Sequence, residues 1–276
     1  MNTNECPYPP SPKVVEALEN MNKDKLRLYP DPDATELADA IAEYYNVNSN
    51  QVFVGVGSDD VLAMSFLTFF NSDKPVLFPD VTYSFYKVWA DLFKVPFETP
   101  VLKEDFTIDV KDYEKENGGV IFPNPNAPTG VYMPLDQVEE ILKANQDVVV
   151  IVDEAYVDFA GPSALELLDK YENLLVVQTF SKSRSMAGMR IGFAMGHPDL
   201  IRALNDVKYS YNSYTMNLPS LLAGVEAVKD KEYFEKTIEK IVATREHAKK
   251  RLQEVKPVQQ PASNVPPKPV DIFVDD

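Results

Sequence analysis

The chain has 276 residues, of which 45% are hydrophobic, so it is long enough for one large domain and part of a second. Its formal net charge of −16 argues against nucleic acid or an anionic membrane as the main partner. The single cysteine, Cys6, cannot form an internal disulfide, and no apolar run approaches the ~20 residues that cross a bilayer. Because the first residues also lack the basic and apolar stretches of a secretory signal, we expect a cytoplasmic protein.

The N-terminal part begins with a proline-rich segment, residues 1–30, which we expect to form an extended arm with a short helix over residues 12–21. Apolar residues at helical spacing predict a second helix over residues 32–45. Residues 51–57 then predict a strand that runs into a glycine turn. We expect the polar residues 58–60 to cap the apolar helix that follows.

Strand and helix alternate from residue 75 onward. The expected strands are 75–78, 119–122, 148–152, 174–178 and 191–195, and the expected helices are 83–92 and 135–145. The run at 148–152 is entirely β-branched, which is typical of a strand buried on both faces. The alternation predicts an α/β fold in three layers, with a mostly parallel sheet between helices.

The last third of the chain is mainly helical and includes a long charged helix over residues 230–255. We therefore expect residues 31–205 to form a large domain and residues 206–255 to begin a small helical one. Residues 256–276 read as a proline-rich tail with one apolar patch at 270–274.

Three segments in this order carry groups that could hold pyridoxal phosphate: NPNAPTG at 124–130, DEAY at 153–156, and SK at 181–182 followed by GMR at 188–190. A lone lysine is usually a solvated surface charge, but Lys182 stands after a buried strand in this pattern. Its amine could form an imine with the cofactor aldehyde. The nearby cations Arg184 and Arg190 are expected to favour the neutral amine.

The strand-end residues would meet the cofactor ring. Asp153 follows the most apolar strand, where it could simply cap the strand exit or, as a buried anion, pair with a protonated pyridine nitrogen. Tyr156 and Asn126 could hydrogen-bond the phenolic oxygen of the ring. Tyr83 could stack on the ring, although most of the 14 tyrosines must be core or surface residues.

The phosphate is expected at the glycine turn after the first strand, where a helix N-terminus presents free N–H groups to an anion. Ser58 and Asp59 lie there, and Ser181 and Arg190 would offset the acidic charge. The same residues would equally suit an ordinary capped helix. The two histidines have no Cys or Glu at ligand spacing, so we expect no metal site.

Taken together, these motifs resemble those of the fold-type I pyridoxal-phosphate aminotransferases (class I/II), and among them the histidinol-phosphate aminotransferase family. The segments that carry the resemblance are NTNECPYPPSP (2–12), LYPDP (28–32), GSDD (57–60), PNPNAPTG (123–130) and SKSRSMAGMRIG (181–192). The similarity runs from residue 2 to about residue 254.

The resemblance implies a cytoplasmic enzyme of histidine biosynthesis that moves an amino group between histidinol phosphate and 2-oxoglutarate. Its partners would be a small amino-acid or amino-alcohol phosphate, a 2-oxo acid and a second copy of the chain. In that homodimer Tyr29 would reach the cofactor phosphate of the other subunit. Lys182 would move the proton at the substrate α-carbon, with Asp153 and Tyr156 as the other catalytic groups.

The chain departs from the family after Arg251, where relatives carry an arginine that holds the amino donor's carboxylate and no counterpart is found. We therefore expect an incomplete small domain, with cofactor binding retained better than turnover. Two alternatives stay open. One is another member of the group, an aromatic aminotransferase or a phosphothreonine decarboxylase. The other is a non-catalytic cofactor-binding fragment.

Overall fold

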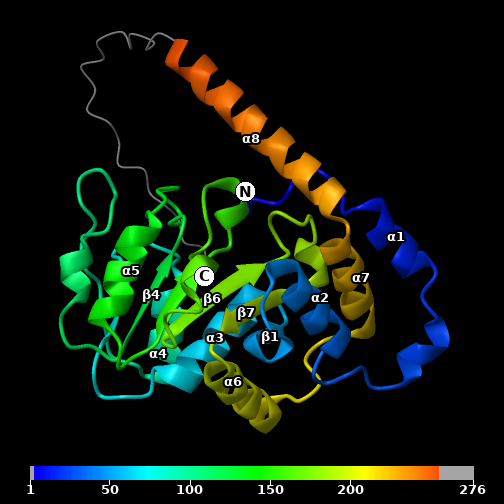
Figure 1. Cartoon of the computed structure of the whole chain (residues 1–276), viewed down its shortest axis with the longest axis horizontal. Helices are drawn as coiled ribbons and strands as arrows, with labels where there is room; N and C mark the ends of the chain where they lie inside the picture. The colour runs from blue at the N-terminus through cyan, green and yellow to red at the C-terminus, as the bar shows by residue number, and fades with distance from the viewer. Residues whose placement is uncertain (1–2, 255–276) are drawn as a thin grey trace, which may run out of the picture.

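The computed structural model describes residues 3–254, drawn in colour in Figure 1. The tail at 256–276 and its apolar patch at 270–274 lie outside the described residues. The chain folds around one seven-stranded sheet, with helices on both of its faces. This is the three-layer α/β arrangement that the sequence predicted.

The strands of the sheet lie in the order β1-β7-β6-β5-β4-β2-β3. They are β1 (Val52–Gly55), β2 (Val76–Leu77), β3 (Phe97–Glu98), β4 (Gly119–Pro123), β5 (Val150–Asp153), β6 (Leu174–Thr179) and β7 (Gly192–Gly196). Strands β3, β2, β4, β5 and β6 are parallel, whereas β7 is antiparallel to both β6 and β1. The sheet is therefore mostly parallel, with one reversed strand near its edge.

The central strands are buried on both faces, as their β-branched sequences predicted. On β5, Ile151 packs into one apolar cluster, while Val150 and Val152 pack into another on the opposite side of the sheet. All three side chains are fully buried. A strand with two apolar faces needs two covering layers, which the helices supply.

The helices are α1 (Pro12–Glu19), α2 (Thr35–Tyr45), α3 (Ser58–Phe69), α4 (Phe85–Phe93), α5 (Leu135–Ala144), α6 (Pro198–Tyr211), α7 (Leu218–Lys229) and α8 (Lys231–Glu254). Helices α3, α4 and α6 share one cluster on one face of the sheet. Helix α5 packs on the opposite face. A third cluster holds α1, α2 and α7 against β1 and β7.

Helix α8 projects away from this body (Figure 1). Only two of its side chains are buried, Phe234 and Thr237, both near its start. The sequence predicted this long charged helix to begin at residue 230, one residue before its observed start, and its predicted last residue, 255, lies outside the described residues. Between residues 3 and 254, no helix is both long and apolar enough to cross a membrane.

The start of α3 differs from the prediction. Residues 58–60 were expected to cap this helix, but its N-cap is Gly57, with φ +90°, and no side chain caps it. Ser58 is the first helical residue, and the Asp60 carboxylate reaches back to accept from the Val56 N–H at 2.9 Å. The backbone N–H groups at the start of α3 therefore lack a side-chain cap.

Candidate active site

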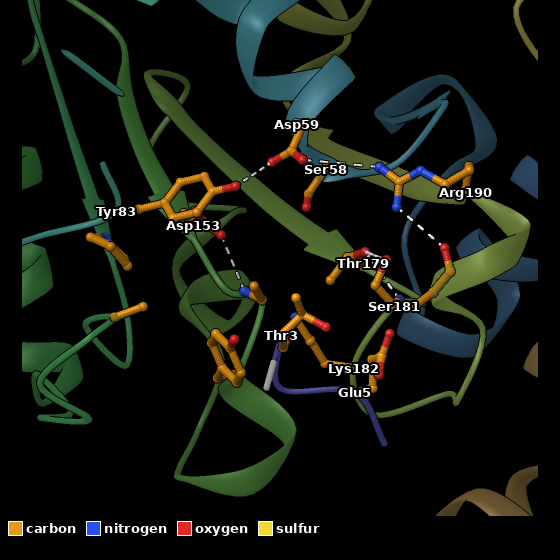
Figure 2. Close-up of a pocket in the computed structure, with 15 residues that line it drawn as sticks. Thr3, Glu5, Ser58, Asp59, Tyr83, Asp153, Thr179, Ser181, Lys182 and Arg190 are labelled. Atoms are coloured by element: carbon orange, nitrogen blue, oxygen red, sulfur yellow. Dashed lines mark hydrogen bonds and ion pairs between the residues drawn. The ribbon is translucent and has the colours of Figure 1, made fainter. Parts of the chain in front are cut away.

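A cavity of about 300 Å³ lies where the carboxyl ends of β4, β5 and β6 meet the N-terminus of α3 (Figure 2). Each strand contributes its last residue to the wall: Pro123, Asp153 and Thr179. Parallel strands present their carboxyl ends at one edge of a sheet, and open α/β sheets bind ligands there. The cavity also has the size of a small-molecule site.

Asp153 sits at the buried end of the cavity with 5% of its surface exposed. Its carboxylate accepts a hydrogen bond from the Tyr86 hydroxyl at 2.7 Å and another from the Ala155 N–H at 3.2 Å. Burial raises the pKa of Asp153 to about 6, although both hydrogen bonds lower it. A buried carboxylate with two neutral donors and an open side toward a cavity is suited to a cationic ligand group.

The neighbouring Glu154 points away from this site. Its carboxylate accepts from Ser163 Oγ at 2.6 Å, the Ala164 N–H at 2.6 Å and Gln178 Nε2 at 2.9 Å. Burial raises the pKa of Glu154 to about 7. Asp153 ends the strand and lines the cavity, whereas Glu154, the residue after it, is turned to these other partners.

Lys182 and Tyr156 face each other across the cavity, with Lys182 Nζ 5.6 Å from the centre of the tyrosine ring. Lys182 Nζ donates to the backbone oxygen of Thr3 at 2.9 Å, and the Tyr156 hydroxyl accepts from Asn4 Nδ2 at 3.1 Å. The loop after β6 thus delivers an amine to the same space that Asp153 faces.

The glycine turn brings the start of α3 against Arg190. A Cβ at Gly57 would lie 2.5 Å from Arg190 Nη2, so only glycine lets the guanidinium approach this closely. Likewise, a Cβ at Gly192 would collide with the Gly57–Ser58 backbone at 2.2 Å. The result is a cradle of free N–H groups, the Ser58 side chain and a guanidinium, which suits an anion.

Asp59, in the first turn of α3, is balanced by its neighbours. Its carboxylate lies 4.0 Å from Arg190 Nη2 and accepts from the Tyr83 hydroxyl at 2.8 Å (Figure 2). Burial and the bond to Asp59 raise the pKa of Tyr83. Ser181 completes this side of the cavity, where its hydroxyl accepts from Thr179 Oγ1 at 3.0 Å.

Eight of the ten site residues predicted from the sequence line this single cavity: Ser58, Asp59, Tyr83, Asp153, Tyr156, Ser181, Lys182 and Arg190. Asn126 is buried beside it but does not line it, because its amide donates to Val81 O at 2.9 Å and Thr129 Oγ1 at 3.0 Å. Tyr29 lies away from the cavity of its own chain, 81% exposed and tilted against the Tyr214 ring at 4.6 Å.

Arg184 does not share the cavity that Lys182 lines. Arg184 lines a separate small cavity and donates from Nη1 to the backbone oxygen of Ala227 at 2.8 Å. The loop turns between Lys182 and Arg184, so their side chains point to different sides of it. Arg190 does line the wall that Lys182 shares.

Sequence reasoning missed two features of the site. Thr3 and Glu5 from the N-terminal segment form part of the cavity wall, as Figure 2 shows. Tyr86, the second residue of α4, supplies the hydroxyl that holds Asp153. The NTNE sequence at 2–5 was noted only as part of a resemblance, and no local signal marks which of many tyrosines reaches a residue 67 positions away. Across residues 3–254, no three His, Cys, Asp or Glu side chains gather in a way that could hold a metal ion.

The chain matches a known protein family. The family "Aminotransferase class I and II" matches residues 1–268. A histidinol-phosphate aminotransferase of Clostridium botulinum is 56% identical over 245 residues, which cover 89% of this chain and 69% of that protein. One from Brachyspira hyodysenteriae is 54% identical over 256 residues, covering 92% of this chain and 72% of that protein.

Solved structures share the fold. The crystal structure of histidinol-phosphate aminotransferase from Sinorhizobium meliloti in complex with pyridoxal-5'-phosphate superposes with a TM-score of 0.83 at 23% identity. The match covers 92% of this chain and 70% of that one. At this identity the likeness concerns the fold alone.

Proposed function

This chain belongs to the class I and II aminotransferases, enzymes of the transaminase type, and from that membership we propose its cofactor and substrates. The cofactor is pyridoxal 5'-phosphate, and the reaction moves an amino group between L-histidinol phosphate and 2-oxoglutarate in histidine biosynthesis. The observation that carries the proposal is that Asp153, Lys182 and Arg190 face one cavity. The choice of substrate is supported by relatives of that name at 54% and 56% identity.

The residues present fit this cofactor at each of its chemically different parts. The buried Asp153 carboxylate suits a protonated ring nitrogen, and the amine of Lys182 suits the aldehyde. The cradle formed by the start of α3, Ser58 and Arg190 suits the phosphate. A carboxylate whose pKa is raised to about 6 by burial gains a compensating charge when a cation binds beside it.

When bound, pyridoxal phosphate supplies an electron-poor ring that withdraws electrons from the substrate α-carbon. Asp153 keeps a proton at the ring nitrogen, because a carboxylate beside that nitrogen favours its charged form. Lys182 Nζ takes the proton from the substrate α-carbon as a base and returns a proton as an acid. Tyr156, across the cavity from Lys182, would hydrogen-bond the phenolic oxygen of the ring.

The proposal extends to a cytoplasmic homodimer with shared sites. Tyr29 is 81% exposed and follows a stretch with two further exposed apolar side chains, Leu26 and Leu28. Such an exposed apolar segment is suited to cover by a second subunit. There Tyr29 would add a hydroxyl to the phosphate cradle of the partner.

A single-turnover half-reaction tests the function. The chain is loaded with pyridoxal phosphate, and either glutamate or histidinol phosphate is added while the visible band of the bound cofactor is followed. We expect both compounds to remove the band and glutamate to yield 2-oxoglutarate. A single-turnover format detects the chemistry even where repeated turnover is slow.

Matched substrates separate the alternatives. Histidinol, which lacks only the phosphate, and phenylalanine should react at least about 10-fold more slowly, because charge-assisted phosphate contacts are lost. Faster reaction with phenylalanine would point to an aromatic aminotransferase. Release of carbon dioxide from phosphothreonine would point to a decarboxylase, and no change with any amine would contradict the proposal.

A further inference from the structure

Arg184 is a buried cation held by aromatic rings. Its surface is 7% exposed, and its guanidinium carbon lies 4.2 Å from the ring centre of Phe234, 4.8 Å from that of Tyr44 and 5.3 Å from that of Phe180. Nη1 donates to the Ala227 backbone oxygen at 2.8 Å. A buried charge needs such compensation, and ring faces together with a carbonyl provide it.

The cage joins separate parts of the fold. Phe234 lies on α8, Tyr44 on α2 and Ala227 on α7, whereas Arg184 and Phe180 lie on the loop that follows β6. Arg184 Nη2 and Ser185 Oγ are also buried, with no hydrogen-bond partner among the residues the structure describes. The ring contacts and the bond to the Ala227 oxygen hold the Arg184 side chain away from the cavity that Lys182 lines.

The residues of this loop divide between two sides. Lys182 faces the active-site cavity, whereas the next three residues, 183–185, line the small cavity on the other side. The turn is closed by the Met186 N–H donating to Phe180 O at 3.0 Å, with Ser185 in a left-handed conformation at φ +60°.

We infer that Arg184 is a positioning residue that holds the Lys182 amine in line with the cofactor aldehyde. Arg184 is joined to Lys182 by two peptide units. Releasing Arg184 would therefore free the turn and let the Lys182 side chain sample other directions. Bond formation with a cofactor needs a fixed approach, and a small displacement of a reacting group is costly. The inference rests on the proposed function, in which Lys182 bonds the cofactor.

The test compares two ligands that differ at one group. Pyridoxal phosphate has an aldehyde that can bond the lysine, whereas pyridoxamine phosphate shares the ring and phosphate but has no aldehyde. We expect Arg184→Met to weaken pyridoxal phosphate binding by about 10-fold or more and to change pyridoxamine phosphate binding by less than about 2-fold. Equilibrium dissociation constants from fluorescence titration give both numbers.

Arg184→Lys keeps a cation in the cage and one donor for Ala227 O, so it should restore part of the loss. Arg202→Met, in an exposed arginine on α6, is the matched control and should bind both ligands like the parent. Borohydride reduction with peptide mapping should label the Lys182 peptide of Arg184→Met more slowly than that of the parent.

Equal loss of both ligands in Arg184→Met would overturn the inference, because it would show a general packing role. Unchanged binding of both would overturn it as well. If Arg184→Met does not fold, the loss of pyridoxal phosphate binding relative to the loss of pyridoxamine phosphate binding is measured in Arg184→Lys instead. A parent chain that binds pyridoxal phosphate no better than pyridoxamine phosphate, with no label on Lys182, would instead contradict the proposed attachment and the inference with it.

Discussion

The two ends of the active-site cavity are built differently. At one end Asp153 is 5% exposed, and a core hydroxyl from Tyr86 holds its carboxylate at 2.7 Å. At the other end the Arg190 side chain is 45% exposed, and its ion pair with Asp59 spans 4.0 Å. The first end is fixed by the packing of β5 and α4, whereas the second lies at the surface.

This difference separates two kinds of preorganisation. Core packing holds Asp153 before any ligand arrives, at the cost of burying an acid without a cation. The Arg190 end combines fixed backbone N–H groups with a solvated side chain, and surface ion pairs of this kind contribute little to stability. Substitutions at the buried end should therefore alter chemistry and stability together, whereas those at the exposed end should alter ligand binding alone.

The largest effect is expected between the two ends, at Lys182. Lys182→Ala removes both the amine that bonds the cofactor and the proton carrier, so the half-reaction should slow by about 10⁴-fold or more. Borohydride reduction followed by peptide mapping should then find no label on that peptide. Lys170→Ala, in an exposed lysine, is the control. Label on another lysine of the parent chain would contradict the assignment.

Asp153→Asn should keep the fold and slow the half-reaction by about 10²- to 10³-fold, because a preorganised charge is lost while the volume hardly changes. Single-turnover kinetics measure the loss, and circular dichroism checks the fold. A variant that reacted like the parent would show that the buried end takes no part in the chemistry.

The same variant should show how much the burial of the Asp153 carboxylate lowers the free energy of unfolding. The pKa of Asp153 in the folded chain is about 6, above its ordinary value of 3.8. Its contribution to stability is therefore present below pH 3.8 and lost as the pH rises through 6. Asparagine does not ionise, so the cofactor-free variant should gain about 1–2 kcal/mol over the parent between about pH 5 and pH 8.

Urea unfolding at about pH 5 and pH 8 measures this gain in the free energy of unfolding of Asp153→Asn over the parent. Asp169→Asn, in an exposed carboxylate, is the matched control and should follow the parent at both. A constant difference between Asp153→Asn and the parent would mean that burial does not shift the titration of Asp153.

Arg190→Lys tests the exposed end. Lysine keeps the charge but loses the planar fork, so pyridoxal phosphate binding should weaken by about 10-fold. The urea midpoint without cofactor should stay within error of the parent, because the side chain is 45% exposed. A loss of stability as large as the loss of binding would erase the contrast between the two ends.

The smallest effect is expected at Tyr29. Tyr29→Phe removes one hydroxyl from the proposed partner site, which should weaken cofactor binding by only a few fold, about 1 kcal/mol. Mixing Tyr29→Phe chains with Lys182→Ala chains should form dimers with one intact site and recover part of the activity. A monomer in sedimentation analysis, or a mixture with no recovery, would speak against shared sites.

The sequence predicted most of the elements and the type of fold. The β-branched run at 148–152 marked β5, and all three of its core residues are buried on alternate faces. Side-chain periodicity carries this information because it shows which faces must leave water. The two-residue strand β3 and the reversed direction of β7 were not predicted, because both depend on how the strand pairs with its neighbour in the folded sheet.

The gathering of the site residues in one place also followed from the sequence, since residues at the ends of consecutive parallel strands share one edge of the sheet. Asp153 and Lys182 are such residues, and they line one cavity. The directions of other side chains did not follow. The Asn126 amide donates to Val81 O and Thr129 Oγ1, and Arg184 faces an aromatic cage on the opposite side from Lys182.

Only the tertiary structure decided which distant residues support the site. Tyr86 meets Asp153 across 67 positions, and Thr3 meets Lys182 across 179. A local pattern fixes which faces are apolar and where a strand ends. The partner of a given polar group is instead chosen by the packing of whole elements, so it exists only once the chain has folded.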